Sequence, residues 1–494
     1  MKRKYHIAFD LGAESGRAVV GELVDGQMQM QEILRFKTGT VKLDEQVYCS
    51  AVASYQGIIE ALKKFSIEFG AEPESLGVDS WGCDFALLDS KNRLLGLPYS
   101  YRDKRVNNTE NIIEQKMGAE HLYDLTGIQM LPINTLNQLL GMMRAGDETL
   151  QLADNMLFIG DLMHFFLTGR IATEYTMLTI SQLYNTAKKR YENEVFDCFG
   201  ISKKIQTEII YAGSLYGMLK QEICDKTGIK SAKVITPAVH DTASGFAAIP
   251  AKKGETWYAI SSGTWSILGT EEDRVLITDD TRRFSLSNSG GVFGRNLLLK
   301  NVMGLWIIQQ CKQEWNRTDA SIDYNKIVEL ASAAEPFYAM IDPDSLDFFN
   351  PKDMCKAIID YLKKTNQRQT NDIGQMARIV YESLAFKYRY VIEAISKATG
   401  KKADKLYFIG GGNKNEMLNQ FTVNAVGIVG ITGSSEACIL GNLLMQCCGC
   451  KMISSLEQMR EIAGKSVPKR WYEPAEQEKW DIKYKQFLRI TALK

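Results

Sequence analysis

Apolar and polar positions along the first 36 residues alternate in the pattern of three consecutive β-strands. The apolar run that begins at Ile7 gives way to a short polar stretch with two glycines, and the Asp25-Gly26 pair marks a second tight turn. Over residues 51–69 the period changes, because apolar residues recur at helical spacing. The pattern therefore predicts strand, hairpin turn, strand, hairpin turn, strand and then a helix. Residues 76–89 follow as a strand that a Trp-Gly pair interrupts.

The second half of the chain repeats this order of patterns. Residues 256–270 have the pattern of a strand, a glycine-containing turn and a strand, and residues 373–400 form a long amphipathic helical pattern that ends at a glycine. Residues 406–412 form a short apolar strand that opens on three glycines. Two turns of similar composition, near positions 12 and 263, thus predict two copies of one α/β unit, a mixed sheet with helices. We expect the two copies to face each other across a cleft.

Length, composition and charge narrow the class of protein. A chain of 494 residues exceeds the roughly 250 to 300 residues that one hydrophobic core supports, so at least two domains are expected. The composition, 45% hydrophobic and 24% charged, is that of an ordinary globular protein. The formal net charge of +0 argues against nucleic acid as a partner and favours a small molecule.

Apolar runs and cysteines add expectations about the environment of the protein. No run approaches the ~18 apolar residues of a membrane helix, and Asp10 interrupts the first apolar run too early for a secretion signal. We therefore expect a cytoplasmic protein without a membrane partner, active as a monomer or a homodimer. The cysteines at 447, 448 and 450 cluster, but the four histidines are distant in sequence, which favours buried free thiols over a zinc site.

The first predicted turn has the residues of a phosphate site. Gly12 and Gly16 allow the backbone N–H groups of the turn to approach an anion, and Ser15 adds a hydroxyl donor. Asp10 at the end of the preceding strand is suited to a hydrated magnesium ion, and Arg17 can balance the charge. A purely structural hairpin with an Asp-initiated turn explains this segment equally well.

The second predicted turn and the three glycines have similar chemistry without a cation. Residues 261–265 (SSGTW) combine glycine with hydroxyl side chains, so together with the first turn they would hold a polyphosphate from both sides. The glycines at 410–412 suit a nucleotide that lies on bare backbone, although the segment lacks the last glycine of a dinucleotide fingerprint. The AGKS at 463–466 is interpreted as a helix terminus, because no strand and no first glycine precede it.

A general base is expected at Asp241. His240 and Asp241 follow an apolar strand and precede a helix of small residues, so Asp241 either caps that helix or accepts a proton from a sugar hydroxyl that attacks the γ-phosphate. Trp81 and the carboxylates of Asp79 and Asp84 surround the interrupted strand. They would supply hydrogen bonds and an aromatic wall for a sugar, or they form a bulged strand with a core tryptophan.

Seven segments together resemble the FGGY carbohydrate kinases, in order from residue 6 to about residue 445. They are DLGAESGR, DSWGCDFALLD, YRDKR, HDTASG, SSGTWS, KNVMGLW and IGGGNKNEMLNQ. The resemblance implies two ribonuclease H-like domains, similar to those of actin, hexokinase and Hsp70, with ATP and a sugar in the cleft. It also implies a sugar-binding domain over 1–245, a nucleotide-binding domain over 246–455 and a helical tail over 456–494. Within the family the likeness is strongest to members that convert L-rhamnulose to its 1-phosphate.

The resemblance assigns a role to individual residues. The residues implied to contact ATP are Ala13, Glu14, Ser15, Gly16, Arg17, Thr264, Gln309 and Gly411. The residues implied to contact the sugar are Gly82, His240, Asp241, Thr242 and Asn301, with Asp241 as the proton acceptor and Asp10 near Mg²⁺. Glu14 departs from the pattern, because many sugar kinases have Ser or Thr there, and its carboxylate would repel phosphate unless it points away.

Three other functions compete with this interpretation. A related FGGY kinase for L-fuculose or a pentulose such as xylulose would use the same machinery with a different pocket. An actin- or Hsp70-like protein would use its ATP cycle for assembly or client binding, but Trp81, Asp84, His240 and Asn301 argue against it. A sugar-binding regulator without catalysis is disfavoured by Asp10, Asp241 and Gly411.

Overall fold

The computed structural model describes residues 3–493, which fall into two compact units. The first contains the chain up to Lys252 together with Glu271–Leu298 and Ala437–Val467. The second contains Lys253–Thr270, Leu299–Glu436 and the chain from Pro468 onward. Both units are therefore discontinuous in sequence. The segment Ala437–Val467 lies in the first unit, whereas the sequence analysis assigned most of it to the second domain and the rest to a tail.

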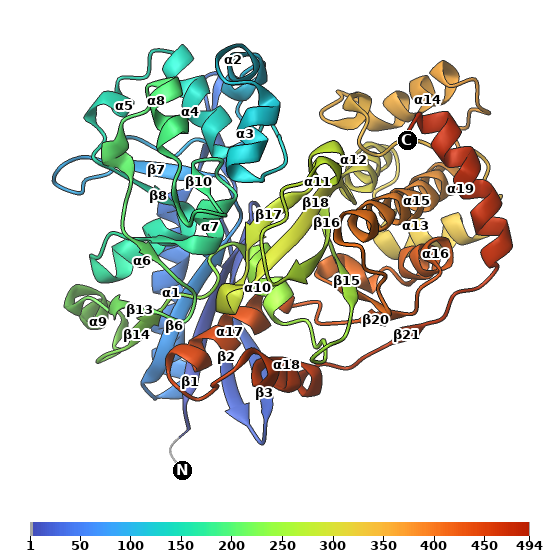
Figure 1. Cartoon of the computed structure of the whole chain (residues 1–494). Helices are drawn as coiled ribbons and strands as arrows, with labels where there is room; N and C mark the ends of the chain where they lie inside the picture. Colours follow the sequence, from blue (N-terminus) through green and yellow to red (C-terminus); the bar gives the residue numbers. More distant parts are fainter. Residues whose placement is uncertain (1–2, 494) are drawn as a thin grey trace. The chain divides into compact units, whose positions relative to one another are not determined.

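The first unit is built on a six-stranded sheet with the strand order β13-β14-β6-β1-β2-β3 (Figure 1). Strand β1 pairs antiparallel with β2 and parallel with β6, so the predicted hairpins and the strand after the first helix all belong to this sheet. The strands are β1 (Tyr5–Leu11), β2 (Ser15–Val24), β3 (Gln27–Lys37), β6 (Pro73–Ser80), β13 (Leu215–Met218) and β14 (Lys233–Ile235).

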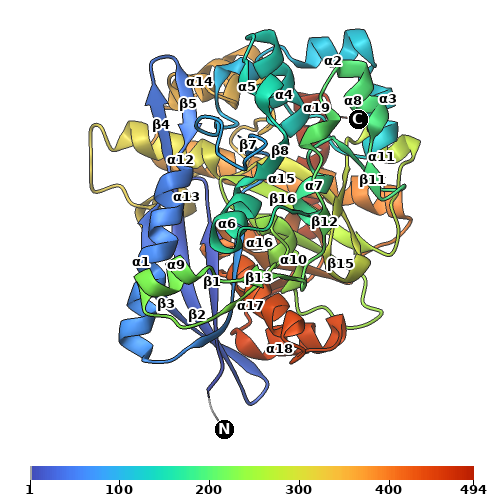
Figure 2. The same cartoon turned by 90° about the vertical axis from the view of Figure 1, so that its left-hand side faces the viewer.

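Alternation along β1 divides the sheet into an apolar face and a polar face. Ile7, Phe9 and Leu11 are buried in one cluster with side chains of α1 (Ala51–Phe69) and α6 (Ile159–Thr168), which Figure 2 shows over the sheet. The residues between them, including Asp10, point to the opposite face. On that side α17 (Ala437–Gly449) packs against β1 and β6.

Helix α17 belongs to the first unit because its polar side chains complete the buried polar face. Gln446 Nε2 donates to Ile7 O at 3.0 Å, and Asn442 Nδ2 donates to Asp79 Oδ2 at 2.6 Å. The helix also approaches α10 (Asp241–Ala247) very closely, since a Cβ atom at Gly441 would lie 1.9 Å from Ser244 O. Glycine at 441 is thus required by packing.

The first unit contains further elements outside this sheet, and a second apolar cluster lies among α4, α7, α8 and β8. They are β4 (Thr40–Leu43), β5 (Gln46–Cys49), β7 (Phe85–Leu88), α2 (Glu110–Lys116), α3 (Ala119–Thr126), α4 (Thr135–Arg144), α5 (Thr149–Leu152), β8 (Asn155–Phe158), β9 (Thr173–Glu174), α7 (Tyr175–Thr179), β10 (Tyr184–Asn185), β11 (Arg190–Tyr191), α8 (Asn193–Phe199), β12 (Ile209–Ile210), α9 (Gln221–Thr227), α11 (Asp279–Arg283), β17 (Ser287–Gly290) and α18 (Leu456–Ser466).

The second sheet repeats the central pairing of the first. Its seven strands have the order β17-β18-β16-β15-β19-β20-β21, and β15 pairs antiparallel with β16 and parallel with β19, as β1 does with β2 and β6. The predicted duplication is therefore confirmed at the level of strand pairing. The strands not yet given are β15 (Trp257–Ser262), β16 (Trp265–Glu272), β18 (Asn296–Met303), β19 (Lys405–Ile409), β20 (Gly430–Thr432) and β21 (Trp471–Tyr472).

Helices of the second unit pack around this sheet, and the long helix expected over 373–400 is α15, which ends at Gly400 with φ of 69°. Aromatic side chains of α15, α16 and α19 share one buried cluster. The helices are α12 (Trp306–Trp315), α13 (Tyr324–Ala333), α14 (Met354–Lys364), α15 (Ile373–Thr399), α16 (Glu416–Val426) and α19 (Gln477–Thr491). Within the described range, none of the helices combines the length and the apolar character that spanning a bilayer requires.

Candidate active site

Three ionisable side chains lie in a row across β6, β1 and β2. The parallel register places Asp79 beside Asp10, and the antiparallel register places Asp10 beside Arg17. Arg17 Nη2 donates to Asp10 Oδ2 at 2.5 Å. All three therefore point to the polar face of the sheet, where α17 packs.

The two neighbouring carboxyl groups have different partners. Asp79 is fully buried, and this burial together with the Asp10 carboxylate raises the pKa of Asp79 well above its usual value. Asn442 donates to its Oδ2 and favours the ionised form, but only in part. Asp10 has the guanidinium of Arg17 as its partner.

The first turn closes with a hydrogen bond from Gly12 N to Ser15 O at 3.0 Å, and Thr38 Oγ1 donates to Gly12 O at 2.6 Å. Ala13 and Ser15 are partly exposed, and Glu14 is exposed. An exposed Glu14 side chain is compatible with an anion at the backbone of the turn.

Gly16 has a packing reason to lack a side chain. A Cβ atom there would lie 2.4 Å from the ring of Phe36, which comes from β3. The same ring lies 2.3 Å from the position of a Cβ atom at Gly57 of α1. Phe36 thus fills the space beneath the turn. The sequence analysis explained Gly16 by the close approach of a phosphate to the backbone and did not identify this contact.

Asp241 is the first residue of α10, and His240 is the N-cap residue. The expected N-cap position of Asp241 is therefore wrong by one residue, although its Oδ1 accepts the N–H of Thr242 at 2.5 Å. The side chain is 32% exposed. Restricted hydration and the Asp10 carboxylate raise the pKa of Asp241 to about 7. A carboxyl group with this pKa can exchange a proton near neutral pH.

His240 and Gly82 lie next to Asp241. Burial lowers the pKa of His240 to about 4, so the imidazole is neutral, with its Nε2 atom 3.7 Å from Asp241 Oδ1. A Cβ atom at Gly82 would lie 3.6 Å from the His240 ring. The structure thus brings Gly82, His240, Asp241 and Thr242 together, and Asp10 is close enough to raise the pKa of Asp241.

The polar atoms of Trp81 and Asp84 form hydrogen bonds inside the protein. Asp84 Oδ2 accepts Trp81 Nε1 at 2.9 Å and Cys49 Sγ at 3.0 Å, and both residues are buried. Burial raises the pKa of Asp84 to about 6. Their hydrogen bonds favour a core tryptophan over direct sugar contact, and Gly82 is the partly exposed residue of this stretch. The expected bulged strand is wrong, because β6 and β7 on either side of the stretch belong to different sheets.

The second turn is held by the start of α12. Gly263 O accepts Leu305 N at 3.0 Å, and Thr264 O accepts the N–H groups of Gly304 and Trp306. Gln309 lies one turn further along α12, and its N–H donates to Leu305 O. Thr264 and Gln309 are thus brought together in the second unit, where Asn301 lies on β18.

The three consecutive glycines have different surroundings. Gly410 has φ of 78°, and a Cβ atom at Gly412 would lie 2.4 Å from Ser262 Oγ. Gly411 is exposed, and a Cβ atom there would meet nothing within 4 Å. Backbone conformation and packing therefore explain two of the glycines, and neither explains Gly411.

A dense metal site is absent from residues 3–493, where no group of three or more His, Cys, Asp or Glu side chains could hold an ion. A hydrated Mg²⁺ ion needs less, because it commonly takes one or two carboxylates together with waters and substrate phosphates. Asp10, near a strand end beside the turn, fits that role.

The sequence analysis missed the contributions of residues far along the chain. Asn442 of α17 contacts Asp79, and Glu174 and Thr176 contact the segment that precedes Asp241. Their only sequence signal is a polar residue within an otherwise apolar or small-residue segment, which does not identify a partner.

Two family models match the chain. The N-terminal domain of the FGGY family of carbohydrate kinases matches residues 5–248, and the C-terminal domain of the same family matches residues 258–450. Together they span most of the chain.

Curated relatives match over nearly the whole length. The rhamnulokinase of Bacteroides thetaiotaomicron is 36% identical over 487 residues and covers 99% of both chains. The rhamnulokinase of Bacillus subtilis is 33% identical over 469 residues and covers 95% of both.

Solved structures show the fold. The ligand-bound xylulose kinase of Lactobacillus acidophilus has a TM-score of 0.80 at 17% identity, covering 99% of this chain and 97% of its own. The glycerol kinase of Plasmodium falciparum with ADP has a TM-score of 0.78 at 14% identity, covering 100% and 99%. These likenesses confirm the predicted two-domain α/β class.

The contact of Phe36 with Gly16 generates a prediction about stability. Gly16→Ala should lower the free energy of unfolding by about 1 to 3 kcal/mol, because the added methyl group collides with the ring. Phe36→Leu in the same chain should recover part of this loss by making room. Denaturant unfolding of both single variants and the double variant measures the coupling, and strictly additive effects would contradict the contact.

Proposed function

Because the chain belongs to the FGGY family of carbohydrate kinases, we propose that it transfers the γ-phosphoryl group of ATP to the 1-hydroxyl group of L-rhamnulose. The choice of sugar is supported by curated rhamnulokinases that are 32% to 36% identical over nearly the whole chain. An ATP-dependent reaction of this kind is proposed for the cytoplasm, as a step of sugar catabolism.

The partly exposed Asp241 carboxyl group, with a pKa of about 7, is the observation that carries the proposal. In the reaction the sugar oxygen forms a bond to the γ-phosphorus, and the bond from that phosphorus to the β–γ bridging oxygen breaks. The hydroxyl proton passes to an Asp241 oxygen, and ADP leaves. A base in this position contributes about 10² to 10⁴-fold to the rate.

The residues proposed to hold ATP come from loops with accessible backbone. In the first unit they are Ala13 to Arg17, where Glu14 contributes its backbone because its side chain is exposed. In the second unit they are Thr264, Gln309 and Gly411. Asp10 would hold Mg²⁺ through water. When bound, the ion supplies positive charge that neutralises the phosphates.

The residues proposed for the sugar are Gly82, His240, Asp241, Thr242 and Asn301. His240 is neutral, so it offers a hydrogen bond to a hydroxyl group without competing with Asp241 for a proton. Gly82 lies close to the imidazole, and a Cβ atom there would also lie 2.5 Å from Ile180 Cδ1, so a side chain at this position would disturb the proposed sugar site.

The competing substrate class is another ketose. Members of this fold include xylulose and glycerol kinases, so the scaffold accepts different acceptors. Identity to the rhamnulokinases exceeds 30% over nearly the whole chain, and this favours L-rhamnulose over L-fuculose or a pentulose.

A substrate panel tests the function directly. L-rhamnulose, L-fuculose, L-ribulose and D-xylulose are compared with magnesium-ATP in a coupled ADP assay, and NMR identifies the phosphorylated carbon. We expect the highest kcat/KM for L-rhamnulose and a phosphate on carbon 1. A higher kcat/KM for another ketose would identify that ketose as the substrate in place of L-rhamnulose. ADP release that does not depend on sugar would contradict the assignment as a sugar kinase.

Asp241→Asn should lower kcat by about two to four decades, because the side chain keeps its shape and loses the proton acceptor. The Kd for ATP should stay within about twofold of wild type, since the variant leaves the proposed ATP residues unchanged. Asp241→Ala serves as the comparison. If Asp241 only stabilised the start of α10, Asn would retain turnover and Ala would lose stability without losing activity in the folded fraction.

The pH dependence gives a second readout of Asp241. The base must be ionised, so kcat of the wild type should fall about tenfold per pH unit below an apparent pKa near 7. The titratable groups that interact with Asp241 include Asp10, Asp79, His240, Cys83 and Cys438, and Asp10 raises its pKa. Asp241→Asn should lack this acidic limb. If kcat fell over the same pH range in the wild type and in Asp241→Asn, the titrating group would not be Asp241.

Gly411→Val should weaken ATP binding and leave sugar binding and stability unchanged. The structure provides open space for a side chain at this position, so any loss comes from the ligand and not from misfolding. Isothermal titration of ATP and of the ketose measures both affinities. Lys414→Ala, an exposed change on the same segment, is the control. Equal loss of both affinities in Gly411→Val would contradict a nucleotide role.

A further inference from the structure

Glu174 is a buried carboxylate at the end of β9 that the proposed mechanism does not use. Its Oε2 atom accepts the N–H of Thr176 at 2.9 Å and thereby caps α7, and it also accepts the Thr176 hydroxyl. The same oxygen accepts the N–H of Val239 at 3.0 Å. A helix cap needs only the bonds to Thr176, so the bond to Val239 needs a separate explanation.

Val239 and His240 immediately precede Asp241 and are held from two sides. On one side Val239 O accepts Ser80 N at 2.8 Å, at the end of β6. On the other side Glu174 accepts Val239 N, and Thr176 Oγ1 accepts His240 N at 3.2 Å. The backbone that leads into Asp241 therefore contacts β6 through its carbonyl group and the Glu174–Thr176 pair through its N–H groups.

We propose that Glu174, together with Thr176, is a positioning residue that fixes the backbone of Val239 and His240 and thereby orients the Asp241 carboxylate toward the sugar hydroxyl. This inference rests on the proposed role of Asp241. Glu174 acts through the backbone that it holds, because its carboxyl group is buried and its Oε2 atom accepts Val239 N.

The chemistry of the pair explains why a carboxylate is used. Burial raises the pKa of Glu174 to about 7, while the donors of Thr176 and Val239 favour its ionised form. Hydrogen bonds to a charged acceptor are stronger and shorter than neutral ones, so they restrict the donor groups more tightly. A small displacement of a catalytic group costs a large factor in rate, and restriction of this segment is therefore useful.

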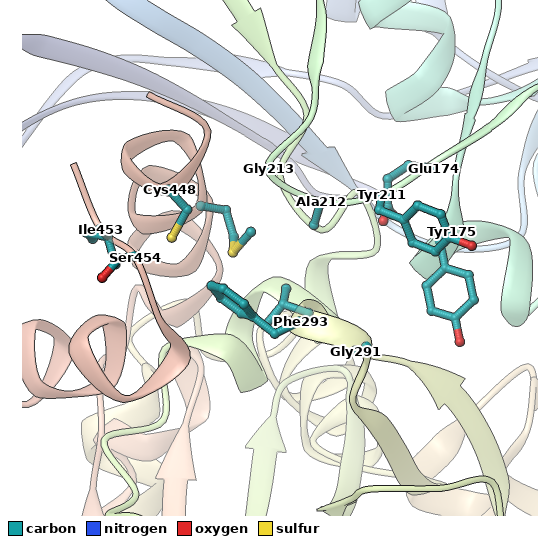
Figure 3. Close-up of a pocket in the computed structure, with 13 residues that line it drawn as sticks. Glu174, Tyr175, Tyr211, Ala212, Gly213, Gly291, Phe293, Cys448, Ile453 and Ser454 are labelled. Atoms are coloured by element: carbon teal, nitrogen blue, oxygen red, sulfur yellow. The ribbon is translucent and has the colours of Figure 1, made fainter. Parts of the chain in front are cut away.

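A pocket of about 360 Å³ borders Glu174 and makes a truncation experiment practicable. Figure 3 shows Glu174, Tyr175 and Tyr211 on one side of it and Phe293 and Cys448 on the other. Because Glu174 borders this pocket, we expect water to fill the space left by a shortened side chain and Glu174→Ala to fold.

Glu192 provides a matched control. It is a buried glutamate of the same unit, it is the N-cap of α8, and it accepts the N–H group two residues ahead, as Glu174 does. Its other oxygen accepts Asn185 Nδ2 at 2.7 Å, within the hairpin of β10 and β11, and the described contacts of its side chain do not involve residues 239–241. Loss of a buried capping carboxylate is common to both positions, and contact with the segment before Asp241 is specific to Glu174.

The experiment measures kcat, KM for ketose and KM for ATP in Glu174→Ala, Glu174→Gln and Glu192→Gln. We expect kcat of Glu174→Ala to fall roughly ten- to a hundredfold with KM for ATP unchanged. Glu174→Gln keeps an acceptor oxygen and should lie between Glu174→Ala and wild type, and Glu192→Gln should stay within about twofold. An equal fall in Glu174→Ala and Glu192→Gln would overturn the proposal in favour of general destabilisation.

A double-mutant cycle with Asp241→Asn tests whether Glu174 acts through Asp241. In the Asp241→Asn background the loss from Glu174→Ala should shrink to less than about threefold, because the group being oriented no longer accepts a proton. The same factor in both backgrounds would overturn the proposal.

Hydrogen exchange separates this inference from the proposed function. The amide of Val239 should exchange faster in Glu174→Ala and remain unchanged in Glu192→Gln, whatever the substrate of the enzyme. If Asp241→Asn retains turnover while the Val239 amide is released as expected, the role of Asp241 fails and the contact stands. Unchanged exchange at Val239 overturns the contact itself.

Discussion

The alignment of Asp79, Asp10 and Arg17 across three neighbouring strands is the constraint on which the chemistry of the first unit depends. Strand register leaves no freedom to separate the two carboxyl groups, and burial together with the Asp10 carboxylate raises the pKa of Asp79. The guanidinium on β2 is the partner of Asp10. Restricted hydration and Asp10 also raise the pKa of Asp241, to about 7.

The second sheet has the same strand pairing as the first, but the equivalent positions carry no charged side chain. At the equivalent positions of the second sheet, Ser261 pairs with Ile409 on one side and with Ile267 on the other. The same strand pairing thus holds an acidic and basic row in one copy and an uncharged row in the other. An uncharged strand end beside glycines suits a nucleotide, whereas the charged row suits a metal ion and a proton acceptor.

Local patterns predicted the hairpins, the first helix and α15, because strand alternation, Asx-Gly turns and helical spacing are properties of neighbouring residues. Several residues of the candidate site, such as Ser15 and Asp241, lie in these turns or at a helix start. Asn301 on β18 and Gln309 within α12 were named only from the family resemblance. The features that local patterns did not predict depend on contacts between segments that are distant in sequence. Three such features are the ring of Phe36 under Gly16, the raised pKa of Asp79 beside Asp10 and the bond from Val239 to Glu174. All of them follow from sheet register and packing, which no short stretch of sequence contains. The discontinuous units have the same origin, since α17 is made late and packs against the earliest strands.

The position of α17 in the chain has a consequence for how the protein is made. Strands β1 and β6 leave the ribosome early, and the helix that covers their polar face is synthesised only after almost the whole second unit. Until then Asp79 lacks the amide of Asn442, and the carbonyl of Ile7 lacks Gln446. The polar face of β1 and β6 is therefore completed only after most of the chain has been synthesised.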